Sequence, residues 1–266
     1  MPNPISDFSR ANTPSFSLNR VCVIGDSHLA AVKLGWDAIR DDFPEVELQF
    51  FGAPADHMDN IVVAEGRLAA GSDMLRKFLV KTSGGLATID NAYSTYLICG
   101  LRFGIAKIQR LCTEYRAEGH IRDDRAPISD PCFFKCVAAG LRDTFAVRTF
   151  LKLREITDAP VTIMHMPMPS DQDTDSALAR VSASVDGVLI RQAFMAASEQ
   201  LARELGFSLA VQPQDTLSSH LRTKAMYALG SMKLVHGLTE SHQSDDYGHM
   251  NGEYGSLVLR SWLRSS

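Results

Sequence analysis

Ser27 and His249 stand near opposite ends of the chain, and each has neighbours that suit covalent catalysis. Ser27 belongs to Gly25-Asp26-Ser27, which follows the apolar run VCVI and precedes the helix-compatible stretch LAAVKLGWDAIR. This pattern predicts a strand, a tight turn and a helix, with the serine at the carboxyl end of the strand, where open α/β sheets bind ligands. The N–H groups at the start of the helix favour negative charge. Ser27 is therefore a candidate nucleophile for acyl transfer.

A serine nucleophile needs a base, and the base needs an acceptor that orients it. The segment Asp246-Tyr247-Gly248-His249 offers both, since a carboxylate three residues before a histidine can accept its Nδ1–H. Nε2 is then free to take the proton of a hydroxyl. The neighbouring Asp245 leaves a one-residue shift of the acid open. A Gly-Asp-Ser turn or an Asp–His pair alone is common, so the conjunction of the two points to a Ser-His-Asp site.

Together the two motifs resemble the first and last conserved blocks of the SGNH/GDSL hydrolase family, including the order Ser…Asp…His. The resemblance implies an α/β fold of the three-layer, flavodoxin-like kind, with a mainly parallel five-stranded sheet covered by helices on both faces. It also implies that Ser27 is the nucleophile, His249 the base and Asp246 the acid that orients it. No cofactor and no metal is implied.

The family's two middle blocks supply oxyanion donors, and this chain follows them only in part. The resemblance assigns Gly52, after ELQFF, to the second block, with a plain strand-ending turn as the alternative. The third block, Gly-x-Asn-Asp in the family, corresponds to Gly100-Leu101-Arg102-Phe103, so Arg102 replaces the asparagine. A lost donor typically costs a few kcal/mol of transition-state stabilisation. A guanidinium can also donate and suits an anion, while a salt bridge is the alternative for Arg102.

Two more histidines and one asparagine lie close to these motifs. His28 follows the nucleophile and could line the pocket, or it could be an exposed residue at the start of a helix. His165 ends the strand-like run PVTIMHM and is a candidate substrate contact or spare base, with a buried structural histidine as the alternative. Asn251 could support the His249 loop.

The composition fits one α/β domain in a globular protein. The chain has 266 residues, of which 45% are hydrophobic and 22% charged, and its net charge of −4 gives no support for a nucleic-acid partner. No apolar run is long enough to span a membrane. Residues 1–19 predict a flexible arm without the apolar segment of a signal peptide. The five cysteines have no disulfide or metal spacing, so we expect a cytoplasmic location.

Strand-like and helix-like segments alternate along residues 20–266, which predicts one domain with a parallel sheet. We expect core strands at 21–24, 47–51, 95–99, 160–166 and 207–211. Helices are expected at 28–40, 133–156, 188–205 and 255–264, and a helix-like segment at 221–230. The segment 61–91 predicts a small hairpin insertion around a Ser83-Gly84-Gly85 turn.

Three functions fit these observations. The leading one is a serine ester hydrolase of the SGNH type that acts on an O-acyl ester of a carbohydrate or on a short-chain lipid ester. The second transfers the acyl group to an alcohol, as SGNH-like acyltransferases do in polysaccharide modification. The third is a catalytically weakened binding module, in which Arg102 anchors an anionic ligand.

Overall fold

A five-stranded parallel sheet forms the centre of the computed structural model, which describes residues 20–120, 123–174, 176–182, 184–234 and 240–265. Its order is β10-β9-β6-β1-β2, and all four pairings are parallel. In chain order the strands are β1 (Arg20–Gly25), β2 (Glu47–Gly52), β6 (Thr95–Cys99), β9 (Val161–Met164) and β10 (Ser208–Ala210). This is the 2-1-3-4-5 order of flavodoxin-like folds. The predicted three-layer α/β fold is confirmed.

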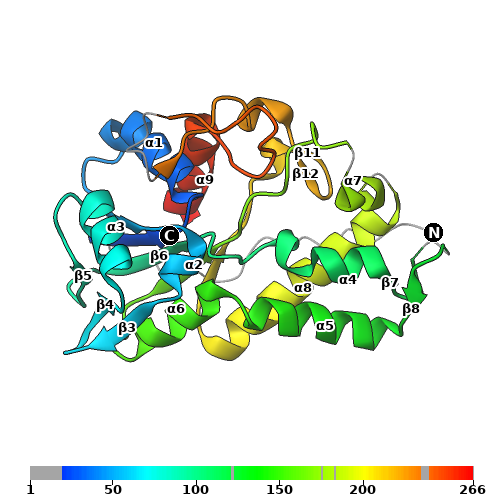
Figure 1. The fold of residues 1–266 in the computed structure, drawn as a ribbon, viewed down its shortest axis with the longest axis horizontal. Helices are drawn as coiled ribbons and strands as arrows, with labels where there is room; N and C mark the ends of the chain where they lie inside the picture. Colours follow the sequence, from blue (N-terminus) through cyan, green and yellow to red (C-terminus); the bar gives the residue numbers. More distant parts are fainter. Residues whose placement is uncertain (1–19, 121–122, 175, 183, 235–239, 266) are drawn as a thin grey trace.

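Helices cover both faces of the sheet (Figure 1). On one face lie α1 (Leu29–Ile39) and α9 (Gly252–Ser265), and on the other lie α3 (Asp73–Ser83), α6 (Phe145–Arg154) and α8 (Asp186–Leu205). After the exposed Arg20, strand β1 has no polar side chain and is buried on both sides. Val21 and Val23 pack under α1 and α9, whereas Cys22 and Ile24 pack in the opposite core.

Helices α1 and α9 touch backbone to backbone through two glycines. A Cβ atom on Gly255 would lie 1.8 Å from the carbonyl oxygen of Ala31, and one on Gly35 would lie 2.3 Å from the carbonyl carbon of Gly255. Neither position has room for a side chain. This close packing holds the last helix, and the loop before it, against the helix that follows Ser27.

The remaining elements surround the sheet. Three short strands form an antiparallel sheet in the order β3-β4-β5, and two further pairs are β7-β8 and β11-β12. Their bounds are β3 (Ile61–Ala64), β4 (Arg67–Ala70), β5 (Thr88–Ile89), β7 (Tyr115–Arg116), β8 (Ala126–Pro127), β11 (Leu217–Ser219) and β12 (Arg222–Thr223). The other α-helices are α2 (Ala55–Met58), α4 (Gln109–Glu114), α5 (Asp130–Arg142) and α7 (Ala177–Ser182). The 3-10 helices are η1 (Arg40–Asp42), η2 (Ile105–Ile108), η3 (Gln214–Thr216) and η4 (Ala225–Tyr227).

The hairpin lies earlier in the chain than the sequence predicts. Strands β3 and β4 pair antiparallel around a turn at Glu65 and Gly66, both with positive φ. The expected turn at Ser83 is instead the end of α3, where Gly84 adopts φ +76° at the C-cap. Buried residues Leu75 and Leu79, one helical turn apart, explain why this segment is a helix.

Two other secondary-structure predictions were wrong. The segment 133–156 is not one helix, because α5 and α6 are separated by Asp143 and by Thr144, whose Oγ1 accepts the N–H of Val147 and caps α6. The segment 221–230 forms β12 and a 3-10 turn. Its apolar residues serve different cores, Leu221 on one side of the sheet and Tyr227 on the other, so no single helical face could bury both.

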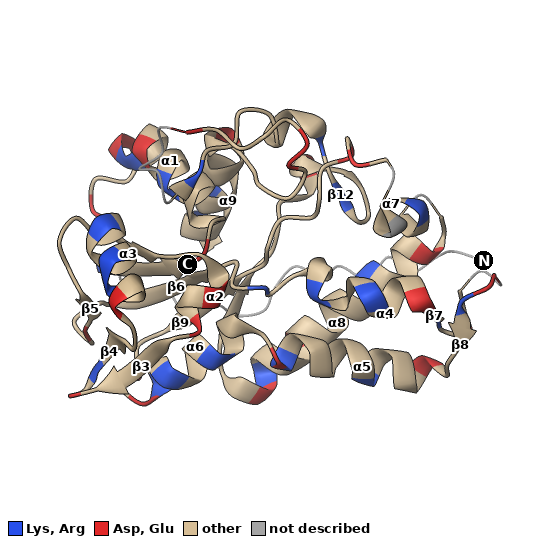
Figure 2. Ribbon diagram, viewed as in Figure 1, with Lys and Arg blue, Asp and Glu red and all other residues tan. Residues whose placement is uncertain are grey.

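Charged side chains of both signs are interspersed over the helices in the part of the chain that the structure describes (Figure 2). Within the same part, no helix is both long and apolar enough to cross a membrane. The predicted arm at residues 1–19 lies outside the described residues.

Candidate active site

Ser27, His249 and Asp246 form one continuous chain of hydrogen bonds. Ser27 lies in the turn between β1 and α1, and the other two lie in the loop before α9. His249 Nε2 is 2.7 Å from Ser27 Oγ, and His249 Nδ1 is 2.7 Å from Asp246 Oδ2. Both distances lie in the range expected for a nucleophile with its base and for a base with its orienting acid. The fold thus brings together the three residues that the motifs singled out.

Asp246 is held as an ionised acceptor by several donors. Its Oδ1 accepts the backbone N–H groups of Gly248 at 3.0 Å and His249 at 3.1 Å. Burial alone would raise the pKa of Asp246, but its hydrogen bonds with His249 and the nearby charge of that ring hold the pKa well below its usual range. The neighbouring Asp245 is exposed, so the hydrogen bonds favour Asp246 as the acid.

Asn251 fastens the His249 loop to the rest of the protein. Its Nδ2 donates to the carbonyl oxygens of Met226 and Leu229, both at 2.9 Å, and its backbone N–H donates to Tyr227 O at 2.7 Å. Its Oδ1 accepts the N–H of Tyr254 in the first turn of α9. These bonds fix the loop at the position where His249 reaches Ser27.

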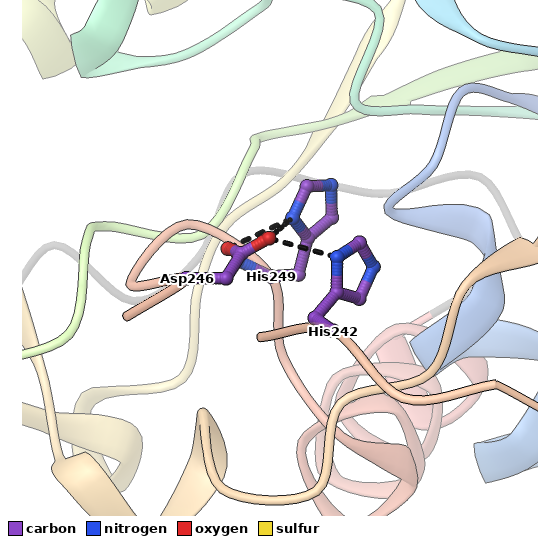
Figure 3. A group of neighbouring side chains, drawn as sticks. All are labelled: His242, Asp246 and His249. Carbon is purple, nitrogen blue, oxygen red and sulfur yellow. Dashed lines mark hydrogen bonds and ion pairs between the residues drawn. The ribbon is translucent and has the colours of Figure 1, made fainter. Parts of the chain in front are cut away.

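His242 joins the site, although the sequence did not single it out. Its Nδ1 is 2.8 Å from Asp246 Oδ2, and its ring stacks on that of His249 with centroids 4.0 Å apart and planes 10° apart (Figure 3). The spacing of four residues from Asp246 was visible in the sequence. In an irregular loop, however, that spacing does not predict a contact, because no helix fixes the geometry.

His28 lies inside the site and is not an exposed residue at the helix start. Its side chain is buried, and its ring stacks on that of His249 with centroids 4.9 Å apart. Burial lowers the pKa of His28, which keeps its ring neutral near pH 7. Two neutral imidazoles, His28 and His242, therefore stack on His249.

Asp26 is a second residue that sequence reasoning missed. Its buried carboxylate accepts the N–H of His28 at 3.1 Å and the N–H of Leu101 at 2.8 Å, which ties the serine turn to the segment after β6. In that segment Gly100 has φ +74°, and a Cβ there would lie 2.5 Å from Asp26 Oδ1. Leu101 (φ +49°) and Arg102 (φ +63°) share this uncommon left-handed conformation, which the surrounding contacts must maintain.

Gly52 does not present the N–H that the family resemblance implies. That N–H donates to Thr82 Oγ1 at 2.9 Å, from helix α3, so it is already engaged. This hydrogen bond favours the turn alternative for Gly52 over the oxyanion role. By contrast, the Ser27 N–H has no hydrogen-bond acceptor among the described residues, and it remains free to donate.

Arg102 points to a partner on the surface. Its Nη2 lies 2.6 Å from Asp56 Oδ1, and its guanidinium lies 4.7 Å from the centre of the Phe145 ring. The side chain is 51% exposed. This geometry favours the salt-bridge alternative over a role in the pocket.

His165 is enclosed by aromatic rings. Its ring centroid lies 5.4 Å from that of Phe103 and 4.9 Å from that of Phe194, and its backbone N–H donates to Ala210 O. Burial lowers the pKa of His165 to about 3, so the ring is neutral over the physiological range. These surroundings favour the structural alternative over substrate contact.

His242, Asp246 and His249 are also close enough to be considered as metal ligands. One ligand atom from each lies within 4.8 Å of the others. Zinc requires lone pairs that converge on one tetrahedral point. Both Nδ1 atoms already pair with the same oxygen of Asp246, and the two imidazole rings stack face to face. The arrangement fits a hydrogen-bonded group better than a metal centre.

No family model and no curated protein matches the chain. Similar solved structures include the periplasmic domain of a lipopolysaccharide acetyltransferase from Salmonella ser. Paratyphi A, with 9% identity, a TM-score of 0.45, and coverage of 94% of this chain and 84% of that one. A DUF4886 family protein from Bacteroides uniformis has 9% identity, a TM-score of 0.42, and coverage of 92% and 82%. Likenesses this distant carry no argument about function.

Proposed function

We propose that the protein is a serine ester hydrolase of the SGNH/GDSL type that acts on an O-acyl ester. The observation that carries this proposal is the hydrogen-bonded chain from Ser27 through His249 to Asp246 at the carboxyl end of β1. The two motifs that contribute these residues lie at opposite ends of the sequence. A structural role for either motif alone would not require the serine hydroxyl and the imidazole to meet.

The proposed reaction begins when Ser27 Oγ attacks the acyl carbonyl carbon and His249 Nε2 takes the hydroxyl proton. The tetrahedral intermediate collapses as His249 delivers that proton to the oxygen of the leaving alcohol. Water, deprotonated by His249, then attacks the acyl-enzyme, and His249 returns that proton to Ser27 Oγ as the acyl–Oγ bond breaks and the acid is released. Asp246 stays ionised, orients Nδ1–H and stabilises the imidazolium formed in each step.

The oxyanion of the intermediate needs donors aimed at it. The free N–H of Ser27 is the donor for which the geometry gives the best support. The guanidinium of Arg102 could add a second only after leaving Asp56. The same pairing argues against the binding-module hypothesis, because the proposed anion anchor already holds a carboxylate.

Transfer of the acyl group to an alcohol uses the same triad and differs only in what attacks the acyl-enzyme.

Turnover of p-nitrophenyl acetate tests the proposal. Ser27→Ala should lower kcat/KM by on the order of a thousand-fold or more, because it removes the nucleophile. Ser219→Ala, at an exposed serine on β11, is the matched control and should leave turnover unchanged. Adding an alcohol such as glycerol separates hydrolysis from transfer through the acylated product. Full turnover by a folded Ser27→Ala protein would refute the proposal.

A further inference from the structure

His242 is a partly buried histidine for which the triad mechanism has no role. Its side chain is 12% exposed, its Nδ1–H points to Asp246 Oδ2, and its Nε2 has no hydrogen-bond partner among the described residues. The imidazole of His242 therefore contacts both the acid and the base of the proposed triad (Figure 3). Packing alone would be served equally well by an apolar ring.

Asp246 Oδ2 receives two imidazole N–H groups, from His249 at 2.7 Å and from His242 at 2.8 Å. A carboxylate oxygen has a fixed negative charge to share between its donors. Each additional donor therefore reduces the stabilisation that the oxygen gives to the other one. When His249 becomes an imidazolium, part of the Asp246 charge is already engaged by His242.

The stacked ring restrains His249 in a second way. The centroids lie 4.0 Å apart and the planes differ by 10°, so the His249 ring cannot tilt toward His242 without steric overlap. His249 must point Nε2 at Ser27 and Nδ1 at Asp246 at the same time. A flat surface against its face favours the one orientation that satisfies both.

We propose that His242 is a positioning residue for the ester chemistry: its bond to Asp246 and its stacked ring hold His249 between Asp246 and Ser27 and moderate the stabilisation of the imidazolium. The proposal rests on the proposed function, because it assigns His242 a role in the same proton transfer. It adds no chemical step, since the proton still moves only between Ser27, His249 and the leaving alcohol.

The surroundings of His242 disfavour its protonation. Burial and the neighbouring His249 lower the pKa of His242, while Asp246 opposes this shift. Lys233 also faces His242 and lowers its pKa further, although this lysine is itself paired with Glu240 at 2.5 Å. The neutral form of His242, which can donate Nδ1–H to Asp246, is therefore favoured.

Two substitutions separate the two contributions of His242. His242→Phe keeps an aromatic ring against His249 but removes the N–H to Asp246, whereas His242→Asn keeps an N–H near the position of Nδ1 but removes the stacked ring. His220→Phe, at an exposed histidine between β11 and β12, is the matched control. Thermal melting checks that each variant folds.

For His242→Phe we expect the acid limb of the kcat/KM profile to move to higher pH, by on the order of one pH unit. Asp246 Oδ2 would then accept a hydrogen bond from the His249 ring without competition from His242, and the His249 imidazolium would form more readily. For His242→Asn the acid limb should stay near that of the wild type, while kcat falls several-fold because His249 is less restrained. A purely structural role for His242 would lower the melting temperature without moving the acid limb.

A readout that needs no turnover uses protein labelled with ring-¹⁵N histidine. In the wild type, NMR should place the ring protons of both His242 and His249 on Nδ1, and His242→Phe should move the His249 Nδ1–H signal downfield. If the wild type lacks ester turnover but this signal moves, the proposed function fails and the positioning role stands. If the signal and the acid limb both match those of the wild type, the positioning role is overturned. One equivalent of zinc in the purified protein that is lost in His242→Asn would overturn it as well.

Discussion

The two sides of the proposed active site differ in how completely the structure assembles them. On the acid–base side, Ser27, His249 and Asp246 form a continuous hydrogen-bonded chain, further supported by His242 and Asn251. On the oxyanion side, among the described residues, the N–H of Gly52 is engaged by Thr82 and the guanidinium of Arg102 by Asp56. The geometry that the proposed nucleophile activation needs is therefore assembled, whereas on the proposed oxyanion side the Ser27 N–H alone has no acceptor among the described residues.

The two sides also differ in how their polar groups are held. The acid and base lie within one turn of chain, and backbone N–H groups of Gly248 and His249 hold the acid locally. On the oxyanion side, Thr82 in α3 accepts the N–H of Gly52, and Asp56 in α2 binds the guanidinium of Arg102. On the same side, Leu101 and Arg102 adopt an uncommon backbone conformation with positive φ. We expect substitutions on the acid–base side to have the larger catalytic effects.

The largest effect expected in this comparison is that of Asp246→Asn. It removes the charge that orients and stabilises His249, and kcat/KM for p-nitrophenyl acetate should fall on the order of a thousand-fold or more. Asp245→Asn is the matched control at the exposed neighbouring carboxylate and should have little effect. Steady-state kinetics of both variants decide the register of the acid. A large loss in Asp245→Asn with a silent Asp246→Asn would contradict the hydrogen-bond geometry.

A smaller effect, on stability, is expected for His165, whose ring stacks on that of Phe103, the residue after Arg102. The unfolded chain binds a proton on this imidazole near pH 6.5, whereas in the folded protein burial lowers its pKa to about 3. Stability is therefore unaffected by this group above pH 6.5 and is lost as the pH falls toward 3. Through His165 the protein should lose about 2 kcal/mol of unfolding free energy between pH 8 and pH 5.

Urea unfolding at several pH values measures that loss. His165→Phe removes the titrating group, so its free energy of unfolding should fall less on acidification than that of the wild type. The variant's stability at pH 8 serves as its own reference, which separates packing changes from titration. If the free energy of unfolding falls equally in the two proteins on acidification, His165 does not contribute to the loss, and the expectation is contradicted.

The smallest effect is expected for Arg102→Asn. Its guanidinium is half-exposed and paired with Asp56, and exposed ion pairs contribute roughly 0.2–1 kcal/mol. Turnover of a neutral acetyl ester should change less than about three-fold, and that of an anionic ester should follow it. Kinetics on the two esters side by side check this expectation. A loss of turnover for the anionic ester alone would contradict this expectation and would support Arg102 as the anchor of an anionic substrate group.

Much of the fold was predictable because its core strands are continuous apolar runs that end at turn residues. Strand β6 occupies the expected 95–99, and the last helix begins close to its expected position. The segment 221–230 could not be predicted in the same way. Its apolar residues divide between two cores on opposite sides of the sheet, and this division is a property of the tertiary structure.

The same distinction applies to the site. Ser27, Asp246 and His249 have local sequence signals, and the structure brings them together. Asp26 and His242 have polar side chains whose partners appear only when β6 and the His249 loop are in place. The pairing of Gly52 with Thr82 links two segments that no motif connects. These contacts depend on the tertiary structure or on the shape of an irregular loop, so no local sequence pattern predicted them.

The central claim, that Ser27 is an activated nucleophile, is tested most directly by intact-mass spectrometry after treatment with a fluorophosphonate. The wild type should gain one adduct, located on Ser27 by peptide sequencing, and Ser27→Ala should gain none. His249→Ala should react far more slowly, because the hydroxyl then lacks its base. Failure of the folded wild type to react, or an adduct on another residue that persists in Ser27→Ala, would contradict the account.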